Sequence, residues 1–436
     1  MSPSVLEPGG RRRRRWIRWL AALLLVGAAA AAAVYFAFLR TPGNVSNPNV
    51  EFTAPKAAPP RKRASTGTDW PLYGLNAQRT RDLESANLAP PFRVLWSFRG
   101  SSLIEFQPVL AKGILFVAEN DGKLVALSAR SGKILWHRQI GRLAAASPAW
   151  SGGRVYAVAN GGGNAGIASA GAGSVWCLDA KTGRVFWRKR LASASESSPL
   201  VQGGRVYLGS QDGTVYALKA ATGSIRWRWR AGGPVKAAIA ASQGRLFVGD
   251  YSGHLTALRA GSGSVLWHAA TSGRSFSRAG NFYATPAVAF GRVYAGNTDG
   301  FVYSFAASSG KLAWRESTGG FVYSAPVAAA TANLPPTVFT GSYSGRFYAF
   351  DARSGHVRWT HNAGGTISGA ASLIGKVIYF STLSKKSTTG LDARTGRVVW
   401  NFARGAFNPA ISDGLRLYIT GYSSLYAFKS RASRTP

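Results

Sequence analysis

The sequence predicts an all-β fold, an eight-bladed β-propeller preceded by an N-terminal transmembrane helix. Three observations lead to this prediction. Tryptophans recur every 40 to 51 residues, seven of them close one short repeated phrase, and the strands left over at the two chain ends complement each other. A period of this length with strand-like content is typical of a propeller with four strands in each blade.

The N-terminal element is an apolar run over residues 19–39 that contains no charged residue and follows arginines at 11–15 and 18. About 20 helical residues cross a hydrocarbon core of about 30 Å. Because basic flanks stay in the cytoplasm, we expect a basic cytoplasmic segment over 1–18, one span of the cytoplasmic membrane over 19–39 and an extracytoplasmic remainder. A cleaved signal peptide is the alternative, since the alanines at 28–33 offer cleavage sites.

The segment after the span, residues 40–68, contains five prolines and a basic cluster at 61–63 and shows no hydrophobic period. This composition predicts a Pro-rich linker that tethers the next domain to the membrane. The propeller is expected over residues 69–429, and residues 430–436 form a basic tail.

The repeated phrase ends in tryptophan and carries a glycine four residues earlier, as in residues 126–136. It is typical of a hairpin between two alternating strands, with the glycine supplying positive φ in the turn. Two more strands precede each phrase, which makes four per unit. We expect the tryptophans to pack between neighbouring blades as structural residues. They are Trp96, Trp136, Trp187, Trp227, Trp267, Trp314, Trp359 and Trp400.

The strand count also predicts how the ring closes. Seven complete four-strand units each end at a phrase tryptophan, the first at Trp136 and the last at Trp400. The C-terminus then supplies three strands, near 408–411, 415–420 and 425–428, and no tryptophan strand. Residues 94–98 form a lone tryptophan strand at the other end of the domain. Pairing the two ends completes an eighth blade and leaves no open edge in the ring.

The phrase resembles the tryptophan-docking motif Ala-x-Asp-x-x-Thr-Gly-x-x-x-Trp of the quinoprotein (PQQ-dependent) dehydrogenases, and residues 177–187 and 390–400 match it nearly in full. Residues 69–80 look like the segment that opens the propeller in that family. The resemblance covers 69–429 and implies the eight-bladed fold. The same repeat builds sensor ectodomains of some bacterial receptor kinases. It also builds the non-catalytic propeller lipoprotein of the outer-membrane β-barrel assembly machinery, which this chain resembles most in layout. No cysteine lies near the span, so the lipid anchor of that lipoprotein is not expected here.

The resemblance to the dehydrogenases implies PQQ bound with Ca²⁺ held by Glu, Asn and Asp, and capped by a disulfide between adjacent cysteines. Cys177 is the only cysteine, so this cap cannot form. Calcium takes six to eight oxygen ligands, whereas most acidic residues of the propeller occupy phrase or turn positions. We therefore expect no enzyme activity, cofactor or metal site. A PQQ-dependent oxidoreductase with an atypical site is the alternative.

The charge of the chain bears on its partners. It has 53 Lys+Arg and 17 Asp+Glu, a formal net charge of +36. The first expectation is a monomeric, non-catalytic protein-binding scaffold of the cell envelope with an envelope protein as partner. Because a strong excess of cations favours anionic partners, binding of cell-wall polymer or lipid is a further alternative. Nucleic acid is not expected, because strand alternation in 226–230 places the arginines on the solvent side and the tryptophans on the other.

The mouth of the central channel is the candidate binding site. Aligning the innermost strands places two sets of positions on the same side of each strand, so these residues form two rings at one end of the channel. The alternative is that they only line a wet channel. The candidates are Glu105, Gln107, Ser147, Glu196, Ser198, Lys236, Tyr283, Thr285, Tyr323 and Asn408.

Overall fold

The computed structural model describes residues 10–34, 43–55, 67–161, 171–271, 280–405 and 407–431. The chain divides into two units, one of residues 1–43 and 272–279 and the other of residues 44–271 and 280–436. The first contains helix α1 (Gly10–Val34), whose stretch Trp16–Val34 has a mean hydropathy of 2.0 and is long and apolar enough to cross a membrane. A signal sequence would have the same properties. Residues 35–39 of the predicted span lie outside the described residues.

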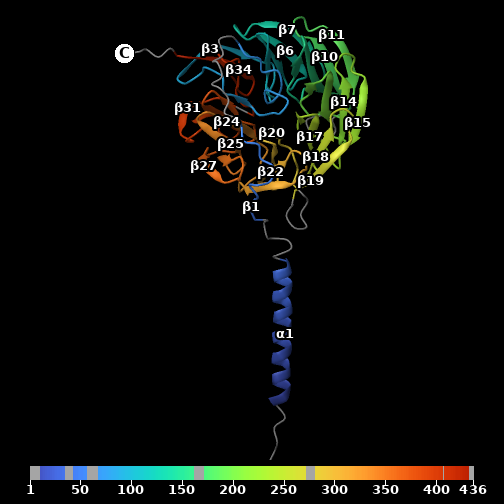
Figure 1. The fold of residues 1–436 in the computed structure, drawn as a ribbon, viewed down its shortest axis with the longest axis vertical. Coiled ribbons are helices and arrows are strands. Elements are labelled where there is room, and N and C mark those ends of the chain that lie inside the picture. Colours follow the sequence, from blue (N-terminus) through green and yellow to red (C-terminus); the bar gives the residue numbers. More distant parts are fainter. Residues whose placement is uncertain are drawn as a thin grey trace, which may run out of the picture. The chain divides into compact units, whose positions relative to one another are not determined.

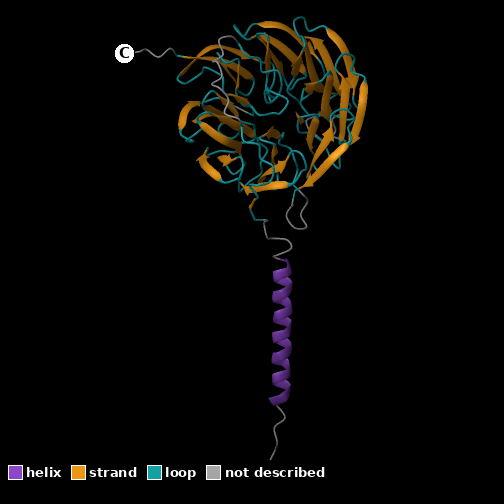
Figure 2. Ribbon diagram, in the orientation of Figure 1, coloured by secondary structure: helices purple, strands orange, loops and turns teal. Residues whose placement is uncertain are grey.

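The second unit is an eight-bladed propeller of antiparallel sheets (Figures 1 and 2). Seven blades follow one another along the chain, each with its strands in sequence order from the channel to the rim. The first three are β4–β7 (Val109–Ala111, Ile114–Ala118, Lys123–Ser128, Ile134–Gln139), β8–β11 (Ala149–Ser151, Arg154–Asn160, Gly173–Asp179, Val185–Arg190) and β12–β15 (Leu200–Gln202, Arg205–Gly209, Thr214–Lys219, Ile225–Arg230). The next four are β16–β19 (Ala240–Ser242, Arg245–Gly249, His254–Arg259, Val265–Ala270), β20–β23 (Ala287–Ala289, Arg292–Gly296, Phe301–Ala306, Leu312–Ser317), β24–β27 (Val327–Thr331, Leu334–Gly341, Arg346–Asp351, Val357–Asn362) and β28–β31 (Ser372–Ile374, Val377–Thr382, Ser387–Asp392, Val398–Phe402).

The eighth blade joins the two ends of the domain, as the strand count predicts. Strand β3 (Phe92–Arg99) pairs antiparallel with β34 (Ser424–Ser430), followed inward by β33 (Leu417–Thr420) and β32 (Ile411–Ser412). The predicted eight-bladed fold with four strands per blade and an N-terminal closing strand is therefore confirmed.

Outer-strand tryptophans fasten each blade to the next. Trp136 Nε1 donates a hydrogen bond to the carbonyl oxygen of Ala180 at 3.0 Å, and its ring packs so closely on Gly183 that an added Cβ would come within 2.7 Å. Gly183 has a φ of +70°, so this glycine serves both the turn and the ring. The same contacts repeat for Trp96 with Ala129 and Gly132, Trp187 with Ala220 and Gly223, Trp227 with Ala260 and Gly263, Trp267 with Ala307 and Gly310, Trp314 with Ala352 and Gly355, and Trp359 with Ala393 and Gly396.

The last tryptophan makes a different contact because no phrase glycine follows it. The ring of Trp400 packs edge-on against Phe92, with 5.3 Å between centroids, at the place where the chain ends meet. A hydrophobic ring contact thus replaces the glycine contact at the closure of the propeller.

Part of the predicted linker binds to the fifth blade. Strand β1 (Val45–Ser46) pairs with β23, and the Phe52 ring lies 5.8 Å from that of Phe290. The buried Arg292 holds this strap of residues 44–55, because its guanidinium donates to the carbonyl oxygens of Pro48, Val50 and Glu51 from the strap and of Ala352 and Arg353 from the next blade. Residues 56–66, with the basic cluster, lie outside the described residues.

Buried and half-buried tyrosines should make the propeller sensitive to alkali. Burial raises their pKa above the ordinary value because it penalises the phenolate. An unfolded tyrosine ionises near pH 10, so above about pH 10 the unfolded chain releases protons that the folded chain keeps, and the free energy of unfolding falls. Burial lowers the pKa of Arg79, Arg81 and Arg292. These three groups therefore make the free energy of unfolding rise with pH, but they are fewer than the tyrosines. The tyrosines are Tyr156, Tyr251, Tyr283, Tyr294, Tyr323, Tyr379 and Tyr418.

Denaturant titrations from about pH 8 to about pH 11 measure this effect. Tyr379→Phe is the control, because the Tyr379 hydroxyl is buried without a hydrogen-bond partner among the described residues. Its removal should leave stability at neutral pH equal or higher and reduce the loss above pH 10. A free energy of unfolding that stays constant up to about pH 11 would contradict the prediction.

Candidate functional site

A plug formed by residues 70–83 closes one end of the central channel. It runs across the innermost strands, and its strand β2 (Asp82–Leu83) pairs in parallel with β28. The plug exchanges backbone hydrogen bonds with six blades, which join Trp70 to Leu110, Pro71 to Trp150, Ala77 to Ala241, Gln78 to Val288, Thr80 to Ala328 and Arg81 to Leu373. Consequently the channel is not open from end to end along the described residues.

Two arginines anchor the plug from inside. Arg79 is fully buried at a φ of +60°, and its guanidinium donates to the carbonyl oxygens of Tyr73, Ile239 at 3.0 Å and Pro199 at 3.3 Å. Arg81, equally buried, donates to the carbonyl oxygen of Pro326 at 3.2 Å. Burial, with the neighbouring charge of Arg81, lowers the pKa of Arg79 to about 9, so the guanidinium is still charged at neutral pH.

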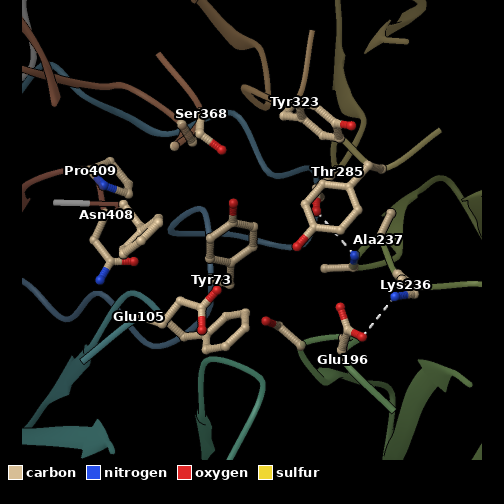
Figure 3. A pocket seen from close by; sticks show the side chains of 17 residues that line it. Tyr73, Glu105, Glu196, Lys236, Ala237, Thr285, Tyr323, Ser368, Asn408 and Pro409 are labelled. Carbon is tan, nitrogen blue, oxygen red and sulfur yellow. Dashed lines mark hydrogen bonds and ion pairs between the residues drawn. The ribbon is translucent and has the colours of Figure 1, made fainter. Parts of the chain in front are cut away.

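A cavity of about 100 Å³ remains at the other end of the channel. Figure 3 shows Tyr73 of the plug in its centre, with Glu105 beside it and Glu196 facing Lys236. By strand direction, this end also carries the loops between the second and third strands of each blade. The lining consists of Tyr73, Glu105, Phe106, Glu196, Ser198, Lys236, Ala237, Ala238, Tyr283, Thr285, Tyr323, Ser368, Gly369, Ala370, Phe407, Asn408 and Pro409.

The structure brings eight of the ten sequence candidates into this cavity and leaves two outside it. Gln107 is buried, and its Oε1 accepts a hydrogen bond from the Gly74 amide at 3.0 Å, which ties the first blade to the plug. Ser147 is also buried, and its amide donates to Ser198 Oγ at 3.0 Å. Sequence reasoning missed Tyr73, because the alignment of innermost strands does not include the plug.

The two carboxylates of the cavity differ in their partners, because Glu196 pairs with a lysine and, among the described residues, Glu105 does not. Glu196 Oε1 lies 2.9 Å from Lys236 Nζ and accepts a hydrogen bond from Gln211 Nε2 at 2.7 Å. Glu105 Oε2 accepts one from Asn120 Nδ2 at 2.9 Å, and no cation pairs with Glu105 in the part of the chain that the structure describes. The two carboxylates and one ammonium give the cavity a net negative charge inside a strongly basic protein.

An aromatic wall extends from the cavity to the surface. The Tyr283 and Tyr323 rings pack edge to face at 5.3 Å, and Tyr323 lies 4.8 Å from Tyr343. Burial raises the pKa of Tyr283, and the carboxylates of Glu196 and Glu105 add to the shift. Around the mouth of the channel, Phe321 is 52% exposed and Tyr343 is 38% exposed. The wall therefore offers both enclosed and open ring faces.

Arginines cover the outer strands of two neighbouring blades. The predicted alternation in 226–230 is confirmed, since Trp227 and Trp229 are half-buried while the arginines between and beside them are exposed. Strand β11 has the same pattern. The exposed arginines are Arg188, Arg190, Arg226, Arg228 and Arg230, of which Arg230 has a carboxylate, that of Asp212, at 3.9 Å.

Comparisons with known proteins agree with this architecture. The sequence matches the family model described as outer membrane protein assembly factor BamB over residues 85–176 and 163–331, more than half of the chain. No curated protein matches it.

Solved structures of low sequence identity share the fold. BamB from Moraxella catarrhalis is 18% identical with a TM-score of 0.65, over 78% of this chain and 100% of that chain. Quinohemoprotein alcohol dehydrogenase from Comamonas testosteroni is 15% identical with a TM-score of 0.67, over 86% of this chain and 82% of that chain. Quinohemoprotein alcohol dehydrogenase ADHIIG from Pseudomonas putida HK5 is 14% identical with a TM-score of 0.65, over 84% and 82%. These identities show the fold alone, and the fold occurs in enzymes and in BamB.

Proposed function

This chain belongs to the family of the outer membrane protein assembly factor BamB, and on that basis we propose that it is a non-catalytic protein-binding propeller of the cell envelope. Helix α1 holds it in the cytoplasmic membrane with the arginine-rich N-terminus inside, and the propeller works outside the cytoplasm. The mouth of the channel, with its aromatic rim, contacts a protein partner.

The size of the cavity is the observation that carries this proposal. Sites for cofactors and small molecules enclose about 300 to 1,000 Å³. The cavity here has about 100 Å³, because the plug fills the opposite end of the channel. That space suits the end of one side chain from a partner rather than a whole cofactor.

The quinone and calcium site that the resemblance to the dehydrogenases implies is capped by a disulfide between adjacent cysteines, which a chain with one cysteine cannot form. Among the described residues, no three of His, Cys, Asp and Glu gather into a group that could hold a metal ion. The lone Cys177 is buried in β10, where burial raises its thiol pKa to about 11 and keeps it neutral at pH 7. These features favour a binding role over PQQ-dependent oxidation.

The rim of the mouth has the composition of a protein contact. Aromatic residues dominate the energetics of protein interfaces because they bury a large area with little conformational entropy. Phe321, Tyr343 and the 57% exposed Tyr422 all lie at this end of the propeller. The outer strands expose mainly aliphatic residues, such as Val398, with Phe186 as an aromatic one.

Photo-crosslinking in cells tests the proposal with matched positions. A photoreactive phenylalanine analogue replaces Phe321 or, as control, Val398, which are 52% and 53% exposed. We expect one discrete adduct with an envelope protein from position 321, lost in Tyr343→Ala, and none from position 398. No adduct at 321, together with calorimetric binding of PQQ and calcium and substrate-dependent dye reduction, would overturn the proposal in favour of the oxidoreductase.

A second candidate function is binding of an anionic cell-wall polymer or lipid, favoured by the exposed arginines of β11 and β15. Such binding should weaken steeply with salt, because exposed charges are screened over about 8 Å at physiological ionic strength. A charge-removing set of Arg226→Gln, Arg228→Gln and Arg230→Gln would abolish it and leave the adduct at position 321 intact.

A further inference from the structure

The channel mouth combines three features. It is a small, half-open cavity, it has tyrosine ring faces as walls, and two of the 17 acidic residues line it. Elsewhere the protein is strongly basic. A carboxylate within an aromatic enclosure attracts cations, because the ring faces carry the negative part of the quadrupole and the carboxylate adds a full charge.

The two carboxylates differ in what they can still bind. The charge of Glu196 is neutralised by Lys236 Nζ at 2.9 Å, and its Oε1 also accepts a hydrogen bond from the Gln211 amide. Glu105 has one neutral donor, Asn120 Nδ2, and no cationic partner in the described chain. The unmatched charge of the cavity therefore resides on Glu105.

One resident contact beside the cavity pairs an ammonium group with a tyrosine ring. Lys236 Nζ, which pairs with Glu196, also lies 5.4 Å from the centroid of the Tyr251 ring. Tyr251 in turn packs on Tyr283 at 6.3 Å, so the same aromatic system continues toward Glu105. One ammonium is already held by a carboxylate and a ring on the Glu196 side. On the Glu105 side the carboxylate lies beside Tyr73 (Figure 3), and no ammonium pairs with Glu105 among the described residues. The Tyr73 ring has the Arg81 guanidinium at 4.8 Å from its centroid, so this ring too accepts a cation.

From these contacts we infer that the Glu105 side of the cavity is a binding site for a primary alkylammonium group, supplied by a lysine side chain of the protein partner. This inference rests on the proposed function and names the chemistry of the contact. A half-open volume of about 100 Å³ has room for an ammonium with its last methylenes. The net charge of +36 opposes binding at long range, but salt screens distant charges while the enclosed carboxylate acts at short range.

The test uses the full-length protein in detergent and ligand-observed NMR titration with Nα-acetyl-lysinamide. Nα-acetyl-norleucinamide, which has the same carbon chain without the amine, is the matched control ligand. We expect lysinamide to bind and norleucinamide not to bind. Glu105→Gln should weaken lysinamide about tenfold, the loss that corresponds to one charge-assisted hydrogen bond. Tyr323→Leu should weaken it as well, whereas Tyr323→Phe, which keeps the ring face, should not.

Glu84→Gln serves as the control variant, because Glu84 does not line the cavity. Equal binding of the two ligands, unchanged affinity in Glu105→Gln, or no binding of lysinamide would each overturn the ammonium site. If the adduct at position 321 is still formed in that case, the proposed protein-binding function is supported and only the proposed lysine contact is wrong. A titration with 1,5-diaminopentane identifies the source of the amine, since tighter Glu105-dependent binding than lysinamide would assign the site to a free diamine and overturn the assignment to a partner lysine.

Discussion

Replacing Trp314 with alanine should lower the free energy of unfolding by about 3 to 5 kcal/mol, the range for a fully buried large side chain. Trp314 is 0% exposed, and its Nε1 donates to the carbonyl oxygen of Ala352 in the next blade at 3.0 Å. Its ring lies between Tyr294 and Phe350 at 5.8 and 5.9 Å. Alanine would leave a cavity between two blades, and the close-packed propeller cannot collapse to fill it. The Ala352 carbonyl oxygen would keep its hydrogen bonds from Arg292 and from the Tyr294 hydroxyl, so the loss comes from the cavity.

Denaturant unfolding of the full-length protein in detergent measures this loss. Trp229→Ala is the control, since Trp229 is half-buried on an outer strand and meets the next blade through a loose ring contact with His268, 6.5 Å between centroids. Trp229→Ala should lower the free energy of unfolding by less than half as much as Trp314→Ala. Trp227 makes the docking contact but is half-buried, so its alanine variant should fall between the two. A loss for Trp314→Ala under about 1 kcal/mol would mean that blade contacts do not depend on the ring.

Sequence reasoning succeeded where local patterns determine the structure. Gly183 and Trp187 stand in one phrase because a hairpin needs positive φ and its outer strand needs a docking ring, so both constraints fall within eleven residues of sequence. The closure by β3 and β34 followed from counting strands, since a blade with three strands needs a fourth. Strand alternation likewise brought eight candidate residues to one end of the channel.

Segments without a period could not be placed from the sequence. The strap and the plug have no regular pattern. Arg292 holds the strap, and Arg79 and Arg81 hold the plug, through backbone carbonyls of distant blades. Nothing in the chain near Arg292 or Arg79 distinguishes them from the many exposed arginines. Gln107 and Ser147 were included in the candidate site because alternation gives the side of a strand but not the depth at which plug residues cover it.

Replacing Arg79 with methionine should loosen the plug and lower the free energy of unfolding by about 2 to 4 kcal/mol. Methionine fills much of the volume but leaves the carbonyl oxygens of Tyr73, Ile239 and Pro199 without their donor. Each buried unsatisfied polar group costs about 1 to 3 kcal/mol. The total stays below the sum of these costs, because burial also penalises the guanidinium charge, as its lowered pKa shows, and that penalty disappears with the charge.

Limited proteolysis, compared with unfolding, separates a local from a global effect. Cleavage within residues 70–83 should become faster in Arg79→Met, because the plug opens before the blades unfold. Arg79→Lys should give an intermediate result, since an ammonium keeps the charge but cannot span three carbonyls as a planar guanidinium does. Arg93→Met, at an exposed position of β3, is the control and should change neither property. If Arg79→Met changed neither the rate of cleavage within residues 70–83 nor the free energy of unfolding, the backbone hydrogen bonds to six blades would suffice to hold the plug.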